Sequence, residues 1–184
     1  DQPRSRGLGD VYKRQKEAML HDWGSRDKDF INLNHSIRKS LIKLIDGEDN
    51  YQCVPMQGSG TFAVESMISS LTPKNAKILI LINGAYGQRM KKICEYVNRD
   101  CIDYVVPEDA THDLDKIEKI IESDRDLTHI FAVYCETTSG ILNPIYKIAK
   151  IAEKNNIALF IDAMSAFGAL PLSCLLYTSD AADE

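Results

Sequence analysis

Two glycines and two hydroxyl residues stand together at Gly58-Ser59-Gly60-Thr61, between a short apolar run and a pattern typical of a helix. The N–H groups and the dipole at a helix start favour an anion, and glycine lets the backbone approach it closely. The tetrapeptide is therefore a candidate phosphate cradle. It is neither a Walker loop, which ends in Gly-Lys-Ser/Thr, nor a GxGxxG loop. A plain turn with Ser59 or Thr61 as the helix cap is the simpler explanation.

Side chains at three other places could act on the same ligand. Asp162 ends the apolar run IALFID, where a carboxylate can accept from a ligand N–H or cap the next segment. Tyr86 could stack on a flat ligand, although a core tyrosine is the commoner explanation. Thr137, Thr138 and Ser139 could donate to ligand oxygens or merely satisfy their own turn. Each signal is weak alone, so the fold must bring them together.

Strands and helices are expected to alternate along the chain. Runs rich in apolar residues predict strands at 51–57, 76–82, 101–106, 128–136 and 157–162. Amphipathic patterns predict helices at 26–46, 61–71, 86–100, 113–123 and 144–156. The nearly all-apolar run 76–82 is typical of a parallel strand that is covered on both faces. The alternation predicts a three-layer α/β fold with a mostly parallel sheet.

Four loops follow predicted strands, at 58–61, 83–86, 136–140 and 162–165. In open α/β sheets, ligands bind at the carboxyl ends of the strands. We therefore expect these loops to be neighbours in space, although they are far apart in the sequence.

Composition limits the classes of function. The chain has 184 residues, 44% hydrophobic and 27% charged, with a net charge of −5, which suits one soluble globular domain. We see no basic stripe for nucleic acid, no apolar run near the ~20 residues that span a membrane, and no signal-peptide core. The 5 cysteines and 4 histidines show no metal-ligand spacing, so we expect free thiols, no metal site and a cytoplasmic location.

Five motifs, in order, resemble one group of enzymes: KEAMLHDWGSRDKDF, CVPMQGSGTFAVESM, NGAYGQRM, CETTSGILNP and IDAMSAFGALP. They cover 16–172 and resemble the 2-aminoethylphosphonate–pyruvate transaminase family. That family lies among the pyridoxal-phosphate aminotransferases, with the alanine– and serine–glyoxylate enzymes. The resemblance implies part of the large domain of a fold-type I pyridoxal-phosphate-dependent transferase. It also implies pyridoxal 5′-phosphate as cofactor, 2-aminoethylphosphonate and pyruvate as substrates, and a homodimer for the full-length enzyme.

The resemblance implies roles for the candidate residues. Ser59, Gly60 and Thr61 match the residues that hold the cofactor phosphate. Tyr86 matches the aromatic residue that stacks on the pyridine ring, and Thr137 matches the hydroxyl near the phenolic oxygen of that ring.

Two further roles concern charged side chains. Asp162 matches the carboxylate that pairs with the pyridine nitrogen. An ionised carboxylate keeps that nitrogen protonated, which makes the ring a better sink for electrons. Arg26 lies in the segment 23–26, which we expect near the active site, and it could meet a phosphonate or carboxylate. A solvent-exposed arginine at the head of a helix is an equally good interpretation.

The family's Schiff-base lysine is expected beyond the segment DAMSAFGALP, and no lysine follows Lys154. Lys147 and Lys150 precede Asp162 and do not match the motif either. The stretches 5–15 and 173–184 resemble translated sequencing adapters. We therefore expect a non-native tail over 1–15, a partial cofactor-binding domain over 16–172 and a second tail over 173–184. Such a fragment would have no catalytic residue of its own and would be inactive.

Two alternatives stay open. One is an alanine– or serine–glyoxylate aminotransferase, which differs in amino donor and acceptor. The other belongs to a different class: a non-catalytic α/β module that binds a phosphate or nucleotide through 58–61. Such a module has no use for Asp162 facing a ring nitrogen.

Overall fold

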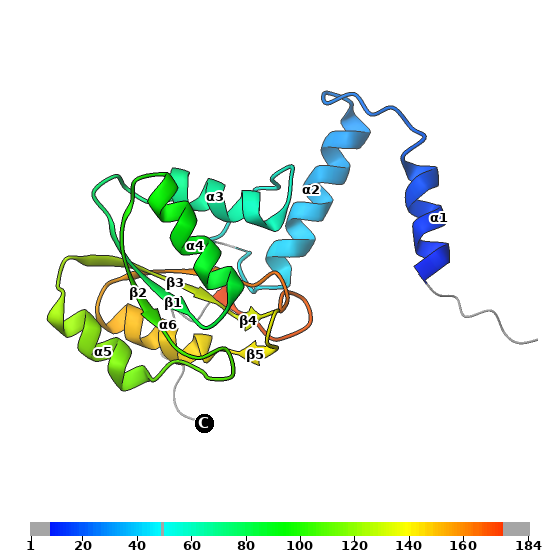
Figure 1. The fold of residues 1–184 in the computed structure, drawn as a ribbon. Helices are drawn as coiled ribbons and strands as arrows, with labels where there is room; N and C mark the ends of the chain where they lie inside the picture. Colours follow the sequence, from blue (N-terminus) through cyan, green and yellow to red (C-terminus); the bar gives the residue numbers. More distant parts are fainter. Residues whose placement is uncertain (1–7, 49, 175–184) are drawn as a thin grey trace, which may run out of the picture.

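A computed structural model describes residues 8–48 and 50–174. Six helices and six strands follow one another in this part of the chain (Figure 1). Their bounds are α1 Leu8–Ala18, α2 Lys28–Lys43, α3 Gly60–Leu71, β1 Lys77–Ile82, α4 Ala85–Tyr96, β2 Asp100–Val105, α5 Leu114–Ser123, β3 Leu127–Val133, β4 Cys135–Glu136, β5 Ile141–Leu142, α6 Ile145–Lys154 and β6 Ala158–Asp162.

A four-stranded sheet lies at the centre, in the order β2-β1-β3-β6, and all its neighbouring strands are parallel. The last residues of β3 and β6, Val133 and Asp162, are register partners. The carboxyl ends of these strands therefore lie at one edge. The predicted α/β fold with a mostly parallel sheet is confirmed.

The alternation of side chains along β1 explains the three layers. Ile78, Ile80 and Ile82 belong to a buried cluster with side chains of α3 and α4. Leu79 and Leu81 belong to another cluster with side chains of α5 and α6. Successive side chains of a strand point to opposite faces, so an all-apolar strand needs a helical layer on each side. Figure 1 shows these two helix pairs on opposite sides of the sheet.

The predicted strand at 51–57 is wrong, because these residues form no strand in the structure. The carbonyl of Cys53 accepts a hydrogen bond of 2.7 Å from Arg38 Nε of α2, and Pro55 has no N–H to give to a ladder. The segment therefore runs along α2 and leads directly to the glycine turn.

Two other boundaries differ from the prediction. The predicted strand at 128–136 divides at Tyr134: β3 ends before it, and β4 follows it and pairs antiparallel with β5, which lies between the predicted strand and the predicted helix at 144–156. The predicted helix at 86–100 ends earlier, at Tyr96, because Asn98 adopts a left-handed φ of 53°. Asp100 then already belongs to β2.

The two ends of the described chain differ in their contacts. Helix α1 stands apart from the sheet in Figure 1, and residues 12–20 are exposed. Cys174, by contrast, is tied to the body: its N–H donates to Ile45 O at 2.8 Å, and its carbonyl accepts from Tyr51 Oη at 2.9 Å. The rest of the predicted C-terminal tail, 175–184, lies outside the described residues.

Several features bear on the classes of function considered above. None of the described helices is long and apolar enough to cross a membrane. The described residues also contain no cluster of acidic, histidine or cysteine side chains that could hold a metal ion. All five cysteines carry free thiols. Burial raises the pKa of the Cys94 thiol to about 12, so this thiol is not a nucleophile at neutral pH.

Candidate functional site

A cavity of about 230 Å³ opens at the carboxyl edge of the sheet, between the start of α3, the first turns of α4 and the end of β6. The residues that line it are Ser59, Gly60, Thr61, Val64, Tyr86, Arg89, Met90, Asp162 and Met164. The structure therefore brings together five of the residues predicted from the sequence: Ser59, Gly60, Thr61, Tyr86 and Asp162.

The start of α3 forms one end of the cavity. Ser59 caps this helix, and its Oγ accepts from Phe62 N at 3.3 Å. The simple capping interpretation is thus correct for Ser59, but it leaves the hydroxyl proton free for a ligand. The first turn of α3 contains no acidic residue, and its first N–H groups lack partners within the helix. This end of the cavity is therefore suited to an anion.

Tyr86 forms a wall beside that end. Its half-buried side chain packs against the cluster beneath α3 and α4 and also lines the cavity. The guanidinium carbon of Arg89, one turn further along α4, lies 5.0 Å from the centre of the Tyr86 ring. Tyr86 can therefore pack against the core and also stack on a ligand in the cavity.

Asp162, the last residue of β6, also lines the cavity. Its Oδ1 accepts from Met164 N at 3.0 Å, so it caps the following turn as the sequence allowed. Its Oδ2 has no hydrogen-bond donor among the residues that the structure describes. The half-buried carboxylate thus retains an acceptor for a ligand N–H.

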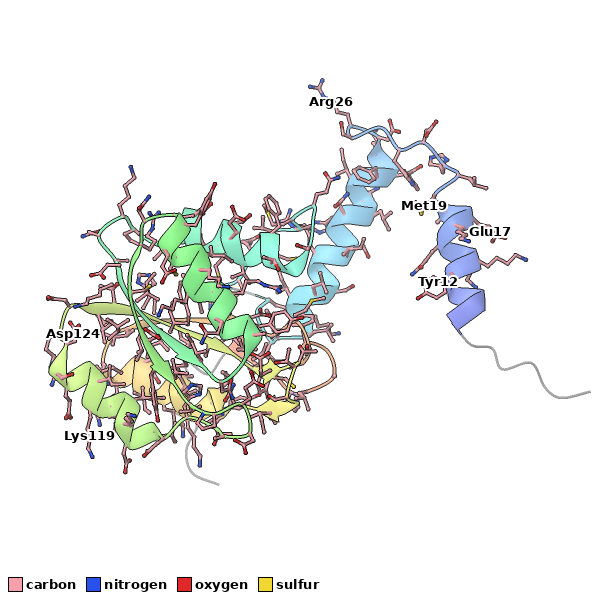
Figure 2. The ribbon with its side chains drawn as sticks, in the orientation of Figure 1. Tyr12, Glu17, Met19, Arg26, Lys119 and Asp124 are labelled. Atoms are coloured by element: carbon pink, nitrogen blue, oxygen red, sulfur yellow. The ribbon has the colours of Figure 1, made fainter. Side chains whose placement is uncertain are left out.

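Thr137 and Arg26, for which the sequence predicts roles at the site, are not among the residues that line the cavity, and neither are the candidate donors Thr138 and Ser139. The hydroxyl of Thr137 hydrogen-bonds to Ser165 Oγ, three residues after Asp162, so it lies close to the site without lining it. Arg26 precedes α2, a helix of 16 residues, or about 24 Å, and its side chain points away from the body (Figure 2). The structure therefore does not bring Arg26 to the cavity.

Sequence reasoning missed Arg89 and Glu136. Arg89 Nη1 donates to Thr61 Oγ1 at 2.9 Å, and helical spacing from Tyr86 could have indicated its position. Glu136 is completely buried and accepts from Tyr86 N at 3.3 Å and from Thr138 Oγ1 at 2.8 Å. It thereby ties the start of α4 to the loop after β4. No sequence pattern marked this carboxylate as buried.

The cavity lining carries charges of both signs. Arg89 and the start of α3 favour an anion, while the carboxylate of Asp162 favours a cation or an N–H donor. A phosphate group fits the first set of donors, and a protonated ring nitrogen fits the carboxylate. The donor set therefore fits pyridoxal 5′-phosphate, with Tyr86 in the same lining as a stacking surface. The cavity lining includes no lysine.

Known proteins resemble the chain in both sequence and fold. The model of the family described as Aminotransferase class-V matches residues 7–182. A 2-aminoethylphosphonate–pyruvate transaminase of Pseudomonas putida (strain W619) is 46% identical over 159 residues, which are 86% of this chain and 43% of the relative. The chain thus spans less than half the length of this curated relative.

Solved structures agree on the fold. Ureidoglycine–glyoxylate aminotransferase of Bacillus subtilis matches with a TM-score of 0.81 at 18% identity, over 89% of this chain and 42% of that protein. An alanine–glyoxylate aminotransferase from Nostoc sp. matches with a TM-score of 0.79 at 21% identity, over 87% and 42%. Together with the family match over nearly the whole sequence, these likenesses lead to one conclusion: the chain belongs to the aminotransferase class-V family.

Proposed function

We propose that this chain is the cofactor-binding part of a pyridoxal-phosphate-dependent aminotransferase. The whole enzyme would move the amino group of 2-aminoethylphosphonate to pyruvate, giving phosphonoacetaldehyde and alanine. The name and 46% identity of the Pseudomonas putida relative support this pair of substrates. The glyoxylate enzymes are a weaker alternative, because their likeness at 18% and 21% identity concerns the fold alone.

One observation carries the proposal: Ser59, Gly60 and Thr61 line one cavity together with Tyr86 and Asp162. A module that binds only phosphate needs the first three residues and has no use for a carboxylate in the same cavity. A ligand with a phosphate and a basic ring nitrogen uses both.

The roles of the residues follow from their positions. When bound, the cofactor supplies an electron sink for the carbon that loses a proton. Ser59, Gly60 and Thr61 would hold its phosphate through hydroxyl and N–H groups, and Tyr86 would cover one face of its ring. Asp162 would hold a proton on the ring nitrogen through its free Oδ2. We keep a role for Thr137 near the ring oxygen as a proposal, because its hydroxyl lies close to the site.

The chain by itself is proposed to bind the cofactor without turning substrate over. No lysine lines the cavity, so the covalent attachment would come from elsewhere in the whole protein. We also propose that 16–172 is part of the large domain, that 1–15 and 173–184 do not belong to it, and that the whole enzyme is a homodimer. Cys174 hydrogen-bonds to Ile45 and Tyr51, so a truncation after Leu172 would test this C-terminal limit of the domain.

The test is a titration of the 184-residue chain with pyridoxamine 5′-phosphate, whose amine cannot react with surface lysines. Its ring absorbance and the thermal midpoint of the chain report binding. We expect saturable binding to one site, weakened by Asp162→Asn and by Ser59→Ala. The control Ser139→Ala removes an exposed hydroxyl outside the cavity lining and should change nothing.

ATP distinguishes the alternative class. A shift in thermal midpoint with ATP, and none with pyridoxamine 5′-phosphate, would support the nucleotide-binding module and contradict the proposed function. For the activity, 2-aminoethylphosphonate and pyruvate should yield no phosphonoacetaldehyde with this chain alone.

A further inference from the structure

We propose that Arg89 is a further ligand of the cofactor phosphate and that it determines the preference of the cavity for phosphorylated ligands. This inference rests on the function proposed above. The guanidinium lines the same cavity as Ser59, Gly60 and Thr61, and its Nη1 donates to Thr61 Oγ1 at 2.9 Å. It therefore lies beside a hydroxyl that the phosphate would contact.

The charge of Arg89 has no acidic partner among the described residues. Two residues further along α4, Lys91 forms a salt bridge of 3.1 Å with Asp103, whereas no such bridge involves Arg89. A guanidinium has five N–H donors, and the contact with Thr61 uses one of them. The cation at the cavity is thus left to attract an anion from outside the chain.

Two contacts hold the guanidinium in place. Thr61 fixes one nitrogen from α3, and the ring of Tyr86, 5.0 Å from the guanidinium carbon, supports it from its own helix. Tyr86 and Arg89 are three residues apart, so they share one face of α4. The cation is therefore oriented before any ligand arrives, which lowers the entropy lost on binding.

Arginine suits this place better than lysine. Its planar fork can donate two parallel hydrogen bonds to phosphate oxygens, and it stays charged at any physiological pH. Arg89 would supply the charge, while the start of α3 would supply N–H groups and hydroxyls.

A purely structural role is the competing explanation. Since Arg89 and Thr61 link α4 to α3, the arginine could serve only to hold the two helices together. Loss of such a link would lower the thermal midpoint and would weaken the binding of phosphorylated and unphosphorylated ligands equally. The two explanations therefore differ in ligand preference, which is independent of stability.

The experiment compares two ligands that differ only in the phosphate, pyridoxamine 5′-phosphate and pyridoxamine. Dissociation constants are measured by ring absorbance for the 184-residue chain and for Arg89→Gln, Arg89→Lys and Lys92→Gln. Lys92 is an exposed cation on the same helix that does not line the cavity, so it is the matched control for charge.

We expect Arg89→Gln to weaken pyridoxamine 5′-phosphate about tenfold, the effect of losing a charge-assisted hydrogen bond, and to leave pyridoxamine unchanged. Arg89→Lys should show a smaller loss that is again confined to the phosphorylated ligand. Lys92→Gln should match the unsubstituted chain with both ligands.

Three results would overturn the inference: no change in Arg89→Gln, an equal loss for both ligands, or the same loss in Lys92→Gln. If Arg89→Gln fails to fold, Arg89→Lys is used instead, and the ratio of its dissociation constants for pyridoxamine 5′-phosphate and pyridoxamine decides. If the unsubstituted chain binds neither ligand, the proposed function itself fails, and the inference about Arg89 fails with it. The three results above differ from this outcome, because in each of them the unsubstituted chain still binds its ligands.

Discussion

Glu136 and Asp162 are two carboxylates at the same edge of the sheet, yet they lie in opposite environments. Glu136 is 0% exposed, and both its oxygens accept hydrogen bonds from its own protein, at 3.3 Å from Tyr86 N and 2.8 Å from Thr138 Oγ1. Asp162 is half-buried, and only its Oδ1 has a protein donor, Met164 N at 3.0 Å.

The difference separates a positioning role from a ligand-binding role. A buried carboxylate without a cation depends on hydrogen bonds for its stability, so Glu136 is bound to the loops around it. The segments that it holds carry Tyr86, at the start of α4, and Thr137, both predicted site residues. Asp162 lines the cavity and retains an acceptor without a protein donor among the described residues. The first carboxylate shapes the site, and the second is available to a ligand.

The largest effect on stability should come from Glu136→Ala. It removes the acceptor of three donors, Tyr86 N, Thr138 N and Thr138 Oγ1, and opens a void beneath the loops, so we expect the free energy of unfolding to fall by about 3 kcal/mol. Urea titration of the chain measures this. Asp162→Ala loses one cap and should cost about 1 kcal/mol or less. Equal losses in the two variants would end the distinction between the carboxylates.

Gly84→Ala tests the same buried carboxylate from its neighbour. A methyl group at Gly84 would lie 2.3 Å from Glu136 Cγ and 2.4 Å from Cδ, so one of the loops must shift. We expect a loss of about 2 kcal/mol from this overpacking. In a Glu136→Ala background the clash is gone, and the additional loss should disappear. A loss that persists in the double variant would show that backbone conformation, and not Glu136, requires this glycine.

Asp162→Asn should leave stability nearly unchanged and affect the ligand. The amide keeps the shape of the side chain but cannot stabilise a protonated ring nitrogen, so we expect about tenfold weaker binding of both pyridoxamine 5′-phosphate and pyridoxamine. Absorbance titrations measure this. The pattern differs from that of Arg89→Gln, which should discriminate between the two ligands. Unaltered binding in Asp162→Asn would remove Asp162 from the site.

The sequence predicted most of the fold because the signals were strong and local. Helix capping at Ser59, the nearly all-apolar run of β1 and the alternation of elements each depend on nearby residues. The prediction of a strand at 51–57 was wrong because a strand needs a neighbouring strand to pair with. Here the side chain of Arg38 donates a hydrogen bond to the Cys53 carbonyl instead. Such competition between distant groups leaves no pattern in the segment itself.

The candidate site divides in the same way. Residues at strand ends and helix starts, such as Asp162 and Ser59, could be predicted from topology and motifs. Arg89 and Glu136 could not, because their importance arises from burial and from contacts across loops. Arg26 was predicted to lie near the active site because of the motif around it. In the structure it precedes α2 and points away from the body (Figure 2).

Thr138→Val gives the smallest effect and the finest test of the comparison. It removes the hydroxyl that donates to Glu136 Oε1 at 2.8 Å while keeping the branched shape of the side chain. Because Thr138 itself is exposed, no cavity forms, and only the hydrogen bond is lost. We expect about 1 kcal/mol lower stability in urea, since the partner left behind is a buried carboxylate. Ser139→Ala, the adjacent exposed hydroxyl with no side-chain hydrogen bond among the described residues, should cost nothing. If the two variants were equally stable, the Thr138 hydroxyl would contribute nothing to holding Glu136, and the positioning role would rest on the backbone donors Tyr86 N and Thr138 N alone.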